Sequence, residues 1–162
     1  FVPEEHLLGE ENGGFQQIMA NFAWERLLMS IGAIGAMDRL IEVSVNYAKE
    51  RQAFGRPIGS FQAIRHKIAM MATRTEASRA FAYDTLRRFH EGEVVVREVS
   101  MSKLDSQRAL VDIADEAIQI HGGYGYMREY EVERALRDAR LGPIGGGTDE
   151  IMMEIIGKTY GL

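Results

Sequence analysis

The sequence predicts an all-α domain, an up-and-down bundle of the four-helix type with short additional helices at its C-terminal end. Three long segments repeat apolar residues at spacings of three, four and seven, which is typical of helices buried on one side. No segment alternates apolar and polar residues for long enough to predict a convincing strand, apart from the first residues. Two glycine-rich stretches precede the last elements and predict sharp corners there.

The first predicted helix runs from about Phe15 to Arg51, and a helix of ~37 residues is about 55 Å long, which favours a long bundle. Its apolar stripe consists of Leu27, Ile31, Ile34, Ile41, Val45 and Ala48. The glycines and proline of "FGRPIGS" then break the pattern and predict a loop. Further helices are expected over Phe61–His90, Val95–Ile120, Glu131–Ala139 and Asp149–Tyr160, the second of the five ended by Gly92.

Composition excludes several classes of protein. The 162 residues carry a formal charge of −5, which argues against a general nucleic-acid binder. There is no cysteine, and the four histidines lack ligand spacing, so no metal site is predicted. No apolar run approaches the ~20 residues of a membrane span. The compartment stays open: cytoplasm in a bacterium, mitochondrial matrix in a eukaryote.

The stretch "GPIGGGTDE", Gly142 to Glu150, has four glycines within six residues, followed by a helix start. Free amides at a helix N-terminus can bind a phosphate. Asp149 and Glu150 argue against that interpretation, because carboxylates at a helix start already compensate the positive end of the helix dipole and repel an anion. An anion site therefore requires both carboxylates to turn away while Thr148 and the amides face the ligand.

Two further stretches have two readings each. In "ERQAFGRPIGSFQ", Arg51 and Arg56 flank Phe54, and Gln62 opens the next helix. One interpretation is an ordinary loop after a helix, and spacing alone favours it. The other is a binding site in which two guanidinium groups and an aromatic side chain contact an anionic ligand. The glycines of "QIHGGYGY" form a helix cap, or they let a ligand ring or ribose approach the backbone.

Glu25 lies in "FAWERLLMS", beside Trp24 and two leucines. A carboxylate in partly apolar surroundings can act as a base near neutral pH. A solvated glutamate beside Arg26 is the alternative, and residue statistics alone favour it.

Together and in this order, these pieces resemble the C-terminal domain of the acyl-CoA dehydrogenase family. The matching text is "VPEEHLLGEENGGF", "YAKERQAFGRPIGSFQAIRHKIAMMA", "AIQIHGGYGYMREYEVERALRDAR" and "IGGGTDEIMMEIIGK", which covers essentially the whole chain. Members are flavoproteins with two preceding domains, and they assemble as homodimers or homotetramers. The resemblance implies that residues 1–14 lead out of a missing β domain and that 15–162 form the helical domain.

The resemblance also implies roles for single residues. Residues expected at FAD are Arg51, Phe54, Gln62, Gln119, Gly122, Gly123, Thr148 and Glu150. All but the last two would reach the cofactor of a neighbouring subunit. Gly146 and Arg26 are expected near the substrate, Arg26 as a residue that orients either the catalytic carboxylate or the loop of Gly145 to Gly147.

The catalytic base departs from the commonest pattern of the family. Many members carry the base two residues before the threonine, and here that position is Gly146, which cannot take a proton. Long-chain and isovaleryl-CoA types instead place a glutamate on the first long helix, and Glu25 matches that position. The resemblance therefore implies that Glu25 is the base, against the reading from statistics alone.

The expected reaction is FAD-dependent α,β-dehydrogenation of an acyl-CoA thioester in fatty acid metabolism, with electron-transferring flavoprotein as the acceptor. Two rivals remain open. One is an acyl-CoA oxidase or a flavin monooxygenase relative, and the other is a catalytically inert helical oligomerisation module. On its own the chain is expected to show no turnover.

Overall fold

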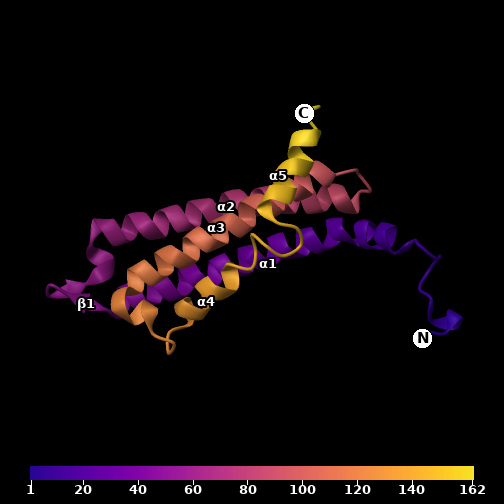
Figure 1. The fold of residues 1–162 in the computed structure, drawn as a ribbon. Helices are drawn as coiled ribbons and strands as arrows, with labels where there is room; N and C mark the ends of the chain where they lie inside the picture. Colours follow the sequence, from indigo (N-terminus) through magenta and orange to yellow (C-terminus); the bar gives the residue numbers. More distant parts are fainter.

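The computed structural model describes residues 1–162 and is built almost entirely of helices (Figure 1). The five α-helices are α1 (Gly14–Glu50), α2 (Gln62–His90), α3 (Val96–His121), α4 (Glu131–Ala139) and α5 (Asp149–Lys158). Short 3-10 turns, Glu4–His6, Ile58–Ser60 and Gly122–Tyr126, join or precede them. The all-α bundle is confirmed, and α1 has the expected 37 residues. Five helix starts and ends shift by one residue, and α5 ends two residues before the predicted Tyr160.

Helix α3 is the centre of the bundle and contacts the other four helices. Helices α1 and α2 run along it, while α4 and α5 pack on it after the two glycine-rich corners (Figure 1). Small side chains on α3 permit this close approach: Ala109, Ala114 and Ala117 are fully buried. No helix combines the length and the apolar character that crossing a membrane requires.

The main core joins α1, α2, α3 and α4 in one cluster of 14 buried residues, to which α1 contributes Ala33, Ile34, Met37 and Leu40. The predicted α1 stripe is partly wrong. Three of its members, Ile31, Ile41 and Val45, are only half-buried, and serines at 30 and 44 are buried instead. The reason is that α1 packs against α2 and α3 together, where the close contacts accept small side chains better than branched ones.

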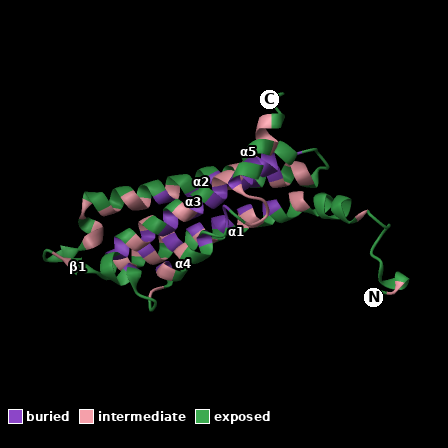
Figure 2. Cartoon of the chain, in the orientation of Figure 1, coloured by how far each residue is buried: buried purple, intermediate pink, exposed green.

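The first part of α1 extends beyond the bundle (Figure 2). No residue of α1 before Arg26 is buried, and large apolar side chains such as Phe15, Ile18 and Trp24 are exposed there. The preceding residues 1–13 contain one 3-10 turn and no strand, so the possible strand at the start of the sequence is absent. This end of the chain contributes apolar surface and no core.

The loop predicted between the first two helices is a small antiparallel hairpin. Strands β1 (Gln52–Ala53) and β2 (Arg56–Pro57) pair two residues each. The turn residues Phe54 and Gly55 have φ of 50° and 77°, which is the pattern of a two-residue hairpin turn with both φ positive. For a bulky side chain such as that of Phe54, this conformation is strained.

Candidate functional site

One group of predicted site residues meets at the loop between α4 and α5. We call residues Gly142 to Thr148 the glycine corner. Arg26 on α1 donates from Nε to the carbonyl oxygen of Gly146 over 3.0 Å. Lys103 on α3 donates from Nζ to the carbonyl oxygen of Gly147 over 2.7 Å. Two consecutive carbonyls are therefore held by cations from two different helices.

The glycines of the corner are required by close packing. A Cβ at Gly146 would lie 2.6 Å from Sδ of Met29, and one at Gly142 would lie 2.0 Å from Oε1 of Gln107. Gly146 and Gly147 also have φ of 66° and 99°, which side chains disfavour. The bare backbone thus packs against α1 and α3, with no room for side chains at these positions.

The cations beneath the corner are buried. Lys103 has no exposed surface and Arg26 is 5% exposed. Burial lowers the pKa of both side chains; nearby Asp149 opposes this for Lys103, and Glu25 opposes it for Arg26. Asp149 itself is buried and forms an ion pair with Arg108 of α3. The buried positive charges of Arg26 and Lys103 therefore lie directly beneath the backbone of the corner, with Glu25 and Asp149 as the nearest carboxylates.

Lys103, Gln107 and Arg108 were not singled out from the sequence. Lys103 stands four residues after Val99 and seven before Leu110, which are both buried on the same face of α3. A lysine in the middle of an apolar stripe was the feature of the sequence that could have indicated a buried, partnered side chain. It was missed because its partner is a backbone carbonyl 44 residues further along the chain.

Glu25 lies on α1 directly before Arg26 and four residues before Met29, so it is one helical turn from the side chain that contacts Gly146. Its side chain is exposed and accepts a hydrogen bond from Nδ2 of Asn21 over 2.7 Å. Within this chain the carboxylate is therefore solvated, on a stretch of helix with exposed apolar neighbours such as Trp24 and Leu28.

The start of α5 meets only one of the two conditions for an anion site. Thr148 caps the helix, accepting at Oγ1 from the amide of Ile151 over 3.4 Å. Asp149 does turn away, into the bundle and toward Arg108. Glu150 stays at the helix start, where hydrogen bonds from its own backbone amide and then from Thr148 lower its pKa. The amides of this turn are therefore already bonded within the chain: that of Asp149 to the Pro143 carbonyl, that of Glu150 to its own carboxylate and that of Ile151 to Thr148.

The second group of predicted residues meets at the other end of α1. Arg51, Gly122 and Gly123 line a cavity of about 480 Å³. The guanidinium carbon of Arg51 lies 5.2 Å from the centre of the Tyr124 ring, which is a cation–π distance. The cavity brings a cation, an aromatic face and bare backbone together, as a planar anionic ligand requires.

Aromatic side chains not predicted from the sequence form the wall of this cavity. The rings of Tyr47 and His121 stack with their centres 4.2 Å apart, and the Tyr47 hydroxyl donates to the His121 carbonyl over 3.2 Å. Burial lowers the pKa of His121, although a 2.7 Å contact of Nδ1 with the Ala117 carbonyl opposes this. These contacts fix the backbone at Gly122 beside Arg51.

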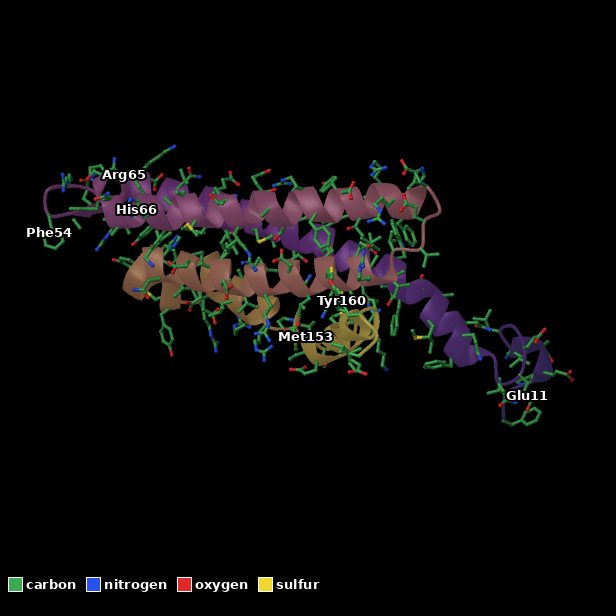
Figure 3. The ribbon with its side chains drawn as sticks, turned by 90° about the horizontal axis from the view of Figure 1, so that it is seen from above. Glu11, Phe54, Arg65, His66, Met153 and Tyr160 are labelled. Carbon is green, nitrogen blue, oxygen red and sulfur yellow. The ribbon has the colours of Figure 1, made fainter.

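Three predicted cofactor residues do not line the cavity within this chain. Gln62 and Gln119 are exposed on their helices, and Phe54 is 93% exposed at the tip of the hairpin. Figure 3 shows Phe54 at one extreme of the molecule, opposite Glu11, with α5 and its Met153 between them. If these three side chains contact a ligand, its other contacts lie outside this chain.

The two groups are far apart. Glu25 and Arg51 are separated by 26 positions of α1, and a rise of 1.5 Å per residue places them about 39 Å apart. One chain therefore presents two half-sites, one at the glycine corner and one at the cavity beside Arg51. No three His, Asp or Glu side chains are grouped as a metal would require.

Comparison with known proteins identifies this arrangement. The family model described as "Acyl-CoA dehydrogenase, C-terminal domain" matches residues 12–161. An acyl-CoA dehydrogenase of Bacillus subtilis is 45% identical over 157 residues, 97% of this chain and 41% of that protein. A mitochondrial isovaleryl-CoA dehydrogenase of Oryza sativa is 42% identical, over 98% of this chain and 39% of that protein.

Solved structures agree with the sequence matches. A probable acyl-CoA dehydrogenase of Mycobacterium abscessus superposes with a TM-score of 0.96 at 45% identity, over 98% of this chain and 42% of that one. An FAD complex of PigA superposes with a TM-score of 0.92 at 32% identity, over 100% of this chain and 42% of that one.

These matches define the class first: the chain is a helical domain of the kind that the family model describes as a C-terminal domain. It belongs to the acyl-CoA dehydrogenase family. The chain spans about two fifths of the length of the curated relatives that it matches.

Proposed function

We propose that the protein carrying this chain dehydrogenates an acyl-CoA thioester at its α,β bond with bound FAD, and that Glu25 removes the α-proton. The observation that carries the proposal is the placement of carboxylates around the glycine corner. Gly146 has no side chain, Asp149 is buried against Arg108, and Glu150 caps its own helix. Glu25 is the remaining acid, exposed and one turn from the contact between Met29 and Gly146.

The residues present fit a flavin dinucleotide. Arg51 contacts the Tyr124 ring and pairs with no carboxylate in the chain, so its guanidinium is available to a diphosphate. Gly122 and Gly123 beside it leave room for a ring or ribose to approach the backbone. FAD, when bound, supplies the acceptor for the hydrogen that leaves the β-carbon as hydride.

The chain's own residues supply the other parts of the reaction. Glu25 accepts the α-proton, and the exposed apolar side chains around it, such as Trp24 and Leu28, exclude water once the acyl chain covers them. Arg26 holds the glycine corner, since its Nε donates to the Gly146 carbonyl and not to Glu25. The second of the two roles expected for Arg26, orientation of the loop, is the one supported by this contact.

We further propose that two copies of the chain complete each site. The two half-sites lie about 39 Å apart along α1, and a second copy is a direct way to bring an Arg51 cavity near a Glu25 corner. A homodimer or homotetramer is expected. Co-assembly of inactive Glu25→Gln and Arg51→Ala subunits should regain activity, whereas two independent single-chain sites would give none.

The test of the base is Glu25→Gln in the full-length protein, with flavin bleaching followed after addition of acyl-CoA. Loss of a general base is expected to slow reduction by about 10²- to 10⁴-fold. Glu42→Gln is the matched control, an exposed α1 glutamate paired with Arg39. Reduction at the wild-type rate in Glu25→Gln would remove Glu25 from the mechanism.

A second experiment moves the base. Adding Gly146→Glu to Glu25→Gln should restore part of the rate, and more of it with Met29→Ala, because Met29 Sδ occupies the space of the new Cβ. The electron acceptor is tested in the same preparation. We propose electron-transferring flavoprotein, as expected from the family; oxygen consumption in its place would indicate an oxidase.

A further inference from the structure

Lys103 is the most unusual side chain of the bundle. It has no exposed surface, lies in the apolar stripe of α3, and donates from Nζ to the Gly147 carbonyl over 2.7 Å. Enclosing an ammonium group costs free energy unless it is well partnered. A leucine or methionine would fill the same position without that cost, so the hydrogen bond to the corner needs an explanation.

The geometry of the corner suggests one. Arg26 holds the Gly146 carbonyl in the same way, and all peptide bonds of the chain are trans. In a trans peptide the C=O of one residue and the N–H of the next point in opposite directions. Because the carbonyls of Gly146 and Gly147 point inward to the two cations, the N–H groups of Gly147 and Thr148 point outward.

Those outward amides are free within the chain. The amides of Gly146, Gly147 and Thr148 donate to no backbone atom, whereas the next one, Asp149, donates to the Pro143 carbonyl over 3.1 Å. A cation on a peptide carbonyl polarises the peptide and strengthens its N–H as a donor. The corner thus presents consecutive free donors, and two of them, the amides of Gly147 and Thr148, belong to the peptides whose carbonyls Arg26 and Lys103 hold.

We propose that Lys103, with Arg26, is a positioning residue that fixes the peptide planes of the glycine corner, so that its free amides are aimed at the thioester oxygen of the substrate. This rests on the proposed function. Lys103 touches neither substrate nor cofactor and acts only through the backbone. Rigid donors aimed at a developing oxyanion are effective because they need not reorganise during the reaction. Asp149, which is buried, and the exposed Arg108 that pairs with it both act on Lys103 electrostatically.

The test uses the full-length flavoprotein and a pair of ligands that differ in one oxygen. Affinity is measured for a 2-enoyl-CoA thioester and for the S-(2-alkenyl)-CoA thioether of equal chain length, which keeps the double bond and lacks the carbonyl oxygen. Lys103→Met removes the donor and keeps an unbranched side chain that is one atom shorter. It should weaken thioester binding about tenfold or more and leave thioether binding unchanged. With a saturated acyl-CoA substrate, kcat should fall more than KM rises.

The matched control is Lys67→Met, which removes a lysine that links α2 to Glu116 of α3 away from the corner. It should leave the preference for thioester over thioether unchanged. If Lys103→Met does not fold, Arg26→Met removes the other half of the clamp and should show the same selective loss. Equal losses for both ligands, or no loss, in a folded variant would overturn the proposal.

A crystal structure of the Lys103→Met variant separates this proposal from the proposed function. The Gly147 peptide should rotate in that variant whether or not the protein uses acyl-CoA. An unrotated peptide refutes the clamp, even if the wild-type protein dehydrogenates acyl-CoA. Conversely, a wild-type protein that binds neither ligand refutes the proposed function. In that case the rotation of the Gly147 peptide in the Lys103→Met variant decides whether Lys103 positions the corner.

Discussion

Replacing Gly147 by alanine is expected to destabilise the chain by about 2 to 4 kcal/mol. Gly147 has φ of 99°, where a side chain costs about 1 to 2 kcal/mol. The new Cβ would also lie 2.9 Å from Cε of Met152 and 3.3 Å from Nη2 of Arg26. Met152 is fully buried, so its displacement adds about 1 to 2 kcal/mol of overpacking.

The matched control is Gly157→Ala on the neighbouring helix α5. A Cβ at Gly157 meets no atom within 4 Å, and alanine in a helix is favoured by up to about 1 kcal/mol. The two substitutions add the same methyl group, one two residues before the start of α5 and the other eight residues after it, yet only Gly147→Ala should be destabilising. Urea unfolding followed by circular dichroism measures both.

With a slope of about 2 kcal/mol per molar urea, Gly147→Ala should lower the midpoint by about 1 to 2 M. Gly157→Ala should leave it unchanged or raise it slightly. A Gly147→Ala midpoint equal to or above that of Gly157→Ala would refute the reasoning, because it would mean that neither the backbone conformation nor the contact with Met152 constrains the corner.

Three further predictions follow from the same structure. Burial lowers the pKa of His121 below its ordinary 6.5, so the unfolded chain binds the proton first as the pH falls; the free energy of unfolding should decrease from about pH 6.5 downward, and His121→Phe should remove that slope in pH-dependent unfolding. Phe54→Asn should raise the thermal midpoint by relieving the φ of 50°, worth about 1 kcal/mol, and a lowered midpoint would show that the Phe54 ring stabilises the hairpin. Arg108→Met leaves the carboxylate of Asp149 buried without its ion pair and should cost about 1 to 3 kcal/mol in urea unfolding; adding Asp149→Asn should recover part of this, and an additive loss would contradict the pairing.

Periodicity carried the prediction of the helices because it reports which face of each helix is buried. It failed in detail on α1, where Ser30 and Ser44 replaced the expected branched residues in the core. Spacing along one helix does not reveal that two other helices approach it closely, and close approach selects for small side chains.

The candidate site was predicted unevenly for a related reason. Arg51, Gly122 and Gly123 were predicted together and do line one cavity. Phe54, an expected neighbour of theirs, projects from the hairpin and away from the bundle (Figure 3). The roles implied by the resemblance apply to an assembled protein. A single chain contains only some of the residues that form each of those contacts.

The sequence by itself determined that this chain is all-α, that glycine corners precede its last two helices, and that it is similar to one family of oxidoreductases. These follow from local periodicity and local backbone preference, which neighbouring residues encode. Only the tertiary structure decided what holds the last corner, namely Arg26 and the buried Lys103, which reach it from 120 and 44 residues away. Hydrogen bonds over such separations depend on how the helices pack, and packing is a property of the whole bundle.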